Sequence, residues 1–168
     1  GLQAKGIDIN RAFAESCRVI GLDVVEGDAI GVLKTMSDGS MGAITSMHLV
    51  EHLPYNDLIR LLDEAYRVLR PGGVIALETP NPENLSVSSH WFFLDPTHRN
   101  PLPPVTLAWL VRHRGFVDPR IERLTADRDV DAPPLLSPDL PGATTINVVL
   151  ERLHAATDYS IVARKPYA

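Results

Sequence analysis

Residues 56–79 constrain the fold more than any other stretch of the chain. In residues 56–70 the apolar side chains recur at helical spacing, at Leu58, Leu61, Leu62, Ala65, Val68 and Leu69. The sequence Pro-Gly-Gly at 71–73 predicts a sharp end to this helix. Residues 74–79, VIALET, then form a short apolar run that predicts a buried strand. A helix that leads directly into a buried strand indicates a parallel α/β sheet with helices on both faces.

The rest of the chain continues this alternation of strands and helices. We expect strands at residues 4–9, 23–28 and 42–47, and helices from Asn10 to residue 20 and at 29–36. After residue 79, 11 of the 14 prolines fall between Pro80 and Pro141, so regular structure is interrupted. In that part the pattern predicts a helix at 104–114, a strand at 116–124, a loop at 127–142, a helix at 145–156 and a last strand at 158–165. Pro119 limits the strand at 116–124 to a sheet edge or a bulge.

Charge and hydropathy exclude several classes of partner. The net charge is −5 and no basic run exceeds two residues, so we expect neither a nucleic-acid partner nor an anionic membrane surface. No apolar stretch approaches membrane-spanning length, and the first residues do not have the pattern of a secretory signal. The one cysteine, Cys17, cannot form an internal disulfide, which fits a reducing, cytoplasmic location.

Polar residues lie just past the predicted strands, where an open α/β sheet binds its ligands. Asp8 follows the first strand, and a carboxylate there can accept both hydroxyls of a ribose. An ordinary helix cap is the alternative for Asp8, although Asn10 is better placed for it. Asp28 can bond an adenine amino group or cap the next helix, and spacing alone does not separate these two roles.

Four passages carry a resemblance to a known family when they are read in order. GIDIN, EGDA, DGSMGAITSMHLVEHL and LLDEAYRVLRPGGVIALETPNPEN resemble the class I S-adenosylmethionine-dependent methyltransferases, from Gly6 to about Leu124 and more weakly at 158–165. The resemblance implies an α/β fold with a Rossmann-like sheet, mostly parallel with an antiparallel last strand, in three αβα layers. It implies a single domain over 1–168, with its core at 4–124 and 158–165 and an insertion or lid at 125–157.

The same resemblance implies a cofactor, S-adenosylmethionine, and the residues that hold it. Asp8 matches the acid that binds the ribose and Asp28 the acid that binds the adenine amino group. Ile9 and Ala29 lie against the adenine, and Ser46 and Met47 lie near the methionine part. The segment FFLDPTHRNPLPP resembles the substrate-side insertion of methyltransferases found near bacterial surface-polysaccharide and lipid-carrier pathways. It implies a small-molecule, carbohydrate-type or lipid-linked acceptor that is methylated at oxygen.

The chain departs from the family at its start. The glycine-rich loop that wraps the methionine end of the cofactor is not present, because only GLQAKGI precedes Asp8. We therefore expect the first strand and first helix of the family to be missing. Three hypotheses would explain this difference. The sequence is a fragment, another segment completes the fold, or the protein is a pseudo-enzyme whose first segment differs from that of the family. A second difference is Gly42, which stands where the family often has an acid. That position is usually structural, so the difference says little about function.

The motif HLVEH, residues 48–52, admits three hypotheses. Two histidines four apart on a helix are the signature of a zinc peptidase, but Pro54 interrupts such a helix two residues later. A second hypothesis is another metal site, because some methyltransferases carry an E-x-x-E-H element that holds a divalent ion. Here His48 takes the place of the first glutamate, beside Glu51 and His52, and His98 could be a fourth ligand.

The third hypothesis needs no metal, and it is the one that we predict. Methyl transfer from a sulfonium to oxygen is an in-line displacement, so the protein must align the acceptor and remove a proton. His48 or His98 is the predicted general base. Two other functions stay open: a non-catalytic module that binds a protein, and a nicotinamide-dependent oxidoreductase that uses Asp8 on its ribose. The helix at 145–156 could cover the sheet, form a lid or mediate a homodimer.

Overall fold

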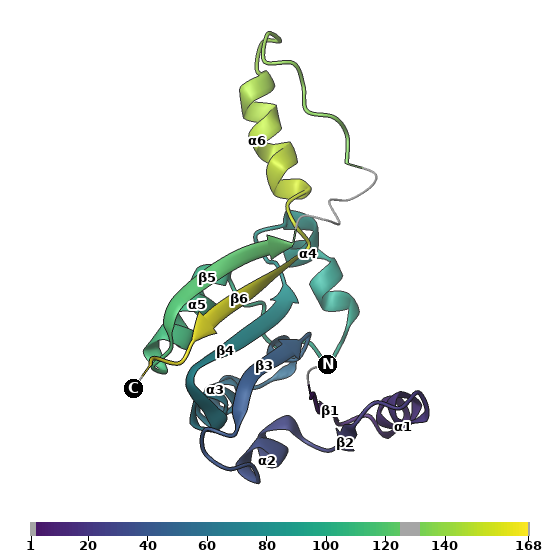
Figure 1. The fold of residues 1–168 in the computed structure, drawn as a ribbon. Coiled ribbons are helices and arrows are strands. Elements are labelled where there is room, and N and C mark those ends of the chain that lie inside the picture. The colour runs from purple at the N-terminus through teal and green to yellow at the C-terminus, as the bar shows by residue number, and fades with distance from the viewer. Residues whose placement is uncertain (1–2, 125–131, 168) are drawn as a thin grey trace.

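The computed structural model describes residues 3–124 and 132–167, which form two β-sheets and the helices around them (Figure 1). The strands are β1 (Gly6–Asp8), β2 (Val24–Glu26), β3 (Met41–Met47), β4 (Leu69–Pro80), β5 (Val117–Leu124) and β6 (Asp158–Arg164). The α-helices are α1 (Arg11–Val19), α2 (Ala29–Lys34), α3 (Tyr55–Val68), α4 (Leu85–Ser89), α5 (Pro104–His113) and α6 (Ala143–Leu153). Two short 3-10 helices are η1 (Val50–His52) and η2 (Trp91–Leu94).

The strands form two separate sheets. One sheet contains β1 and β2 in parallel, and the other has the strand order β3-β4-β6-β5. In the larger sheet β3 and β4 are parallel, and β6 runs antiparallel to both of its neighbours. The predicted α/β class with an antiparallel last strand is therefore confirmed. β5 is an edge strand with a register shift between Val117 and Arg120, as Pro119 predicted.

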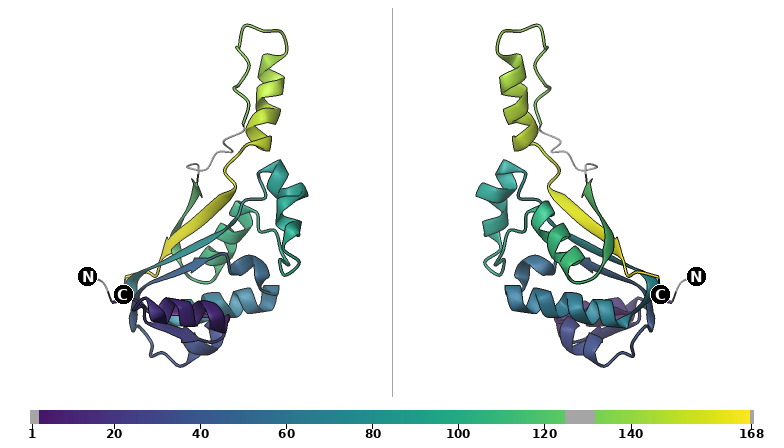
Figure 2. Two further views of the ribbon diagram at one scale, coloured as in Figure 1. Left: turned by 90° about the vertical axis from the view of Figure 1, so that its right-hand side faces the viewer. Right: turned by 90° about the vertical axis from the view of Figure 1, so that its left-hand side faces the viewer.

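The core lies between the four-stranded sheet and helices α3 and α5, which pack on one face of it (Figure 2). Every member of the predicted apolar stripe is buried: Leu58, Leu61, Leu62, Ala65, Val68 and Leu69. The stripe faces Ile75 and Leu77 of β4 and Ile161 of β6. The periodicity of residues 56–70 was therefore sufficient to identify the main face of the core.

Helix α2 joins the two sheets, because it packs on α3 and also touches β1. Its C-terminal end is held by Arg67 of α3, whose guanidinium donates to the carbonyls of Leu33 and Met36 and to the carboxylate of Asp38. The hydrogen bond to Asp38, and after it the hydrogen bond to Glu64, raises the pKa of Arg67. The capping role predicted for Asn10 is confirmed, since its side chain accepts from two backbone N–H groups of α1.

The predicted end of the helix before residues 71–73 is confirmed, but the predicted start of the next strand at residue 74 is wrong. The helix ends at Val68, and β4 runs without interruption from Leu69 to Pro80, with a bulge where Met41 pairs with Leu69 and Ala43 with Val74. Gly72, at φ +75°, donates its N–H to the carbonyl of Lys165. The glycines thus form an irregular strand beside the end of β6 rather than a turn. The short elements η1, α4 and η2 were also not predicted.

Residues 132–153 form an arm that extends beyond the sheet and ends in α6 (Figures 1 and 2). Residues 127–131 of the predicted loop lie outside the described residues, and residues 132–142 contain no helix or strand. Ile146, Val148 and Val149 of α6 are about half exposed. The roles of this arm as an insertion, lid or dimer contact stay predictions. Within the described part of the chain, no helix is both long and apolar enough to cross a membrane.

Candidate functional site

Two acids lie at the carboxyl ends of the two-stranded sheet. Asp8 ends β1 and Asp28 follows β2, and the N–H of Gly27 donates to the Asp8 carbonyl at 2.9 Å. The structure thus places the two predicted cofactor acids close together in space. One carboxylate oxygen of Asp8, Oδ1, accepts from the N–H of Asn10 at 2.7 Å.

Asp28 caps the next helix, which was one of the two roles predicted for it. Its carboxylate accepts from the N–H of Gly31 at 2.7 Å and so caps α2. The bond uses Oδ2, which leaves Oδ1 available at an exposed position. Ile9 is 77% exposed beside Asp8, while Ala29 is half-buried. An exposed isoleucine at the end of a strand is the apolar surface on which the predicted adenine would lie.

The end of β3 carries the other predicted cofactor residues. Ser46 is buried, and its hydroxyl has no hydrogen-bond partner among the described residues. Met47 is 58% exposed. His48 has a φ of +47°, which is uncommon for a residue with a Cβ, and its N–H donates to the carbonyl of Glu78. The chain therefore turns sharply at His48 instead of continuing the strand.

His48 lies among three carboxylates at the carboxyl edge of the larger sheet. Its Nδ1 is 3.2 Å from Oε1 of Glu51, and its Nε2 is 3.6 Å from Glu78 and 3.8 Å from Asp158. His52, by contrast, ends the single-turn helix η1 and bonds Thr97. The two histidines do not share a helix face, so the zinc peptidase hypothesis is wrong.

Glu51 connects several parts of this edge, although the sequence did not single it out as catalytic. Its side chain is completely buried, and Oε2 accepts from the hydroxyl of Thr79 at 2.9 Å. Its carbonyl accepts from the N–H groups of Arg99 and Asn100. These bonds dock the loop after η2 against η1.

His98 lies in this docked loop and faces a cavity. The N–H at Nδ1 donates to the carbonyl of Phe92 at 2.7 Å, which leaves the lone pair at Nε2. The cavity, about 160 Å³, is lined by Pro80, Val87, Trp91, Phe92, His98, Thr157 and Asp158. Its lining is mainly apolar, with one histidine and one carboxylate among the residues.

The aromatic cluster at 91–93 divides between core and surface. Phe92 is buried and anchors the loop. Trp91 and Phe93 are 41% and 64% exposed, and Trp91 lines the cavity together with Phe92. Since η2 is a 3-10 helix, adjacent side chains point in different directions, and only one of the three turns inward.

Hydrogen bonds from Asp95 through Thr97 hold the ring of His52 in place. The hydroxyl of Thr97 donates to Asp95 at 2.6 Å and lies 2.9 Å from Nδ1 of His52. Hydrogen bonds from the hydroxyl and N–H of Thr97, followed by the nearby imidazoles of His98 and His52, lower the pKa of Asp95. Asp95 therefore stays ionised, and the rings of His52 and His98 meet edge to face with centroids 4.7 Å apart.

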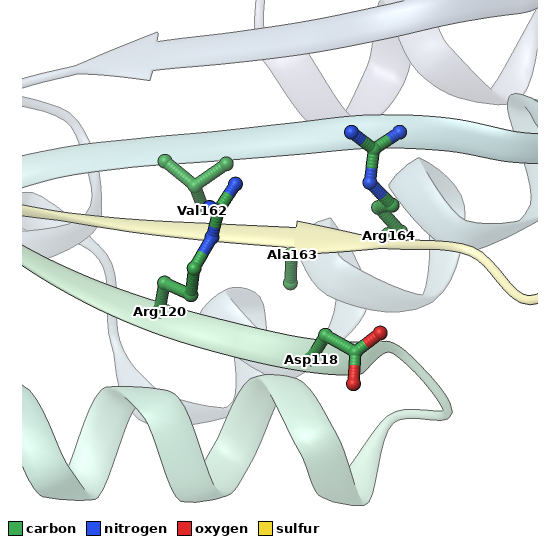
Figure 3. Close-up of a pocket in the computed structure, with 5 residues that line it drawn as sticks. All are labelled: Asp118, Arg120, Val162, Ala163 and Arg164. Atoms are coloured by element: carbon green, nitrogen blue, oxygen red, sulfur yellow. The ribbon is translucent and has the colours of Figure 1, made fainter.

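A second hollow lies on the larger sheet and is lined by Asp118, Arg120, Val162, Ala163 and Arg164 (Figure 3). Arg164 pairs with Val74, near the beginning of β4, whereas Asp158 pairs with Pro80 at its carboxyl end. The hollow is thus at the opposite end of the sheet from His48 and the cavity. None of the predicted site residues lines it, so we place the candidate site at the carboxyl edge.

Comparison with known proteins gives relatives over most of the chain. A probable S-adenosylmethionine-dependent methyltransferase of Mycolicibacterium smegmatis is 33% identical over 81 residues, which are 48% of this chain and 30% of that protein. The chain thus spans about a third of the length of this curated relative. The crystal structure of a SAM-dependent methyltransferase from Archaeoglobus fulgidus has a TM-score of 0.85 at 30% identity, covering 98% of this chain and 77% of that one.

A more distant neighbour shows how widely the fold is shared. A Haemonchus contortus phosphoethanolamine N-methyltransferase, solved with S-adenosylhomocysteine, has a TM-score of 0.66 at 18% identity and covers 99% of this chain and 44% of that one. At this identity the likeness concerns the fold alone. The methyltransferase domain family model matches residues 2–118, which is more than half of the chain. The predicted resemblance is confirmed, and the chain belongs to the methyltransferase domain family.

Proposed function

We propose that this protein transfers a methyl group from S-adenosylmethionine to an oxygen of a small-molecule, carbohydrate-type or lipid-linked acceptor. The observation that carries the proposal is that Asp8, Asp28 and His48 each lie at or just past the carboxyl end of a strand, in a chain of the methyltransferase domain family. Ligands of open α/β sheets bind at this edge.

The cofactor is assigned to the two-stranded sheet and the end of β3. The free oxygens of Asp8 and Asp28 would accept from the ribose and the adenine amino group, with Ile9 and Ala29 against the ring. Met47 is exposed at the end of β3, near the expected position of the methionine part. The carboxylates thus give hydrogen-bond acceptors that match a nucleoside, which offers donors at these atoms.

The acceptor is assigned to the cavity beside His98. Its oxygen attacks the methyl carbon in line with the sulfur, the carbon–sulfur bond breaks, and its electron pair stays on sulfur, leaving a thioether. The hydroxyl proton passes to His48, where the carboxylates of Glu51, Glu78 and Asp158 can balance the positive charge. His98 contacts the acceptor from the wall of the cavity.

Calorimetry with S-adenosylhomocysteine tests this proposal. We expect saturable binding by the wild type, and an Asp8→Ala variant weakened by more than tenfold, equivalent to about 1.4 kcal/mol. Asp23→Ala is the matched control, because Asp23 is an exposed acid of the same region that pairs with Lys5. No binding at millimolar ligand would refute the proposal, and equal affinity of the Asp8 variant and the control would move the ribose site elsewhere.

A further inference from the structure

Three side chains that can bind a metal converge between η1 and the loop after η2. Glu51, His52 and His98 each offer one ligand atom, and these atoms lie within 4.8 Å of one another. We call this group the 51/52/98 cluster. His48 is not a member: its Nδ1 contacts Glu51 from outside the cluster, and its Nε2 lies toward Glu78 and Asp158. The backbone bonds from Arg99 and Asn100 to Glu51 hold the two contributing segments together.

Both imidazoles of the cluster are held in the form that a metal needs. Nδ1 of His98 donates to a backbone carbonyl, so its Nε2 carries a lone pair. The hydroxyl of Thr97 donates to Asp95 and therefore accepts from Nδ1–H of His52, which leaves a lone pair on Nε2 there too. Metal-binding histidines are oriented in this way, by a carbonyl or carboxylate behind the ring.

The buried carboxylate of Glu51 supplies the third argument. It is fully buried, and its partners are the neutral hydroxyl of Thr79 and the imidazole of His48. Within residues 3–124 and 132–167, no lysine or arginine forms an ion pair with it. A buried carboxylate without a cation is costly, and each of its oxygens keeps a lone pair for another partner.

We propose that the 51/52/98 cluster binds one divalent first-row cation such as Zn²⁺. Two imidazole nitrogens and one carboxylate oxygen form the ligand set of an open zinc site, with a fourth position left for another ligand. At metal–ligand distances of about 2.1 Å, tetrahedral ligands stand about 3.4 Å apart, so binding draws the three side chains closer together. Because His98 also lines the cavity, the fourth position opens toward the proposed acceptor.

Calorimetric titration of the metal-free protein with Zn²⁺, repeated with Co²⁺ and its visible absorption, tests the proposal. We expect one ion per chain and loss of at least about 100-fold in affinity, equivalent to about 2.7 kcal/mol, for His52→Ala and for His98→Ala. Thr97→Val removes only the support behind His52 and is expected to weaken binding by about 10- to 100-fold. The Co²⁺ spectrum reports the ligand set independently of any activity.

His113→Ala is the matched control, because His113 stacks on Trp109 at the end of α5, outside the cluster. It should bind Zn²⁺ like the wild type. Absence of stoichiometric binding, or unchanged affinity in His52→Ala and His98→Ala, would overturn the metal site. S-adenosylhomocysteine titrated into the same metal-free protein separates the two proposals: binding there, without a metal site, leaves the proposed function standing and removes only this inference.

Discussion

The buried amide of Asn84 is predicted to be one of the main supports of the candidate site. Its Oδ1 accepts from the N–H groups of Ser86 and Val87 and caps α4, and its Nδ2 donates to the carbonyl of Ala155 at 2.7 Å. The side chain is 1% exposed, so water cannot replace these bonds. Asn84→Ala removes all three, and at about 1 kcal/mol each the free energy of unfolding should fall by about 3 kcal/mol.

Urea denaturation followed by circular dichroism measures this loss, and the midpoint of thermal unfolding should fall by roughly 6–12 °C. Asn56→Ala is the control, because Asn56 is exposed in the first turn of α3, and its loss should stay within about 0.5 kcal/mol. If Asn84→Ala cost less than about 1 kcal/mol, the reasoning would be refuted. Such a result would mean that the bonds between the 84–87 segment and residue 155 do not hold this edge together.

Three further predictions concern single side chains. Lys165→Met removes two hydrogen bonds from Nζ to carbonyls at the C-terminal end of α3 and should cost about 2 kcal/mol by urea denaturation; no change would contradict it. Arg123 lowers the pKa of Glu83, so the stabilisation is present above the unfolded value of about 4.3 and is lost as pH falls through the lower folded value. The stability difference between wild type and Glu83→Gln should therefore shrink from pH 6 to pH 3, and a constant difference would exclude this linkage. Ser46→Ala removes a buried hydroxyl without a partner and should be neutral or stabilising by up to about 1 kcal/mol, whereas a loss of S-adenosylhomocysteine affinity would assign that hydroxyl to the cofactor.

The sequence predicted the elements well where apolar periodicity is long. The stripe of residues 56–70 and the alternation at 158–165 gave α3 and β6, because burial of one face selects both the element type and its orientation. Pro-Gly-Gly at 71–73 correctly indicated the end of the helix, but the early start of β4 at Leu69 was missed, because it depends on pairing with distant segments such as the one at Lys165. Short elements such as α4 and η2 leave too few residues for a period to be recognised.

The site was predicted less completely than the fold. Strand ends identified Asp8, Asp28 and His48, because the carboxyl edge of a sheet follows from the order of its elements. The contact of His52 with Thr97 joins residues 45 apart, and no periodicity encodes such a pair. One local signal was available: an aspartate two residues before a threonine is typical of a turn closed by a side chain, and Asp95 forms that bond.

The division of the strands into two sheets has a consequence for ligand binding. Asp8 and Asp28 belong to a sheet of two three-residue strands, whereas Met47 belongs to the four-stranded sheet, and no ladder joins the two sheets in the described part of the chain. A nucleoside that contacts all three residues would add a second connection between the two sheets, beside the packing of α2. Amide protons of β1 and β2 should then exchange slowly only when the ligand is bound, while those of β4 and β6 are protected throughout.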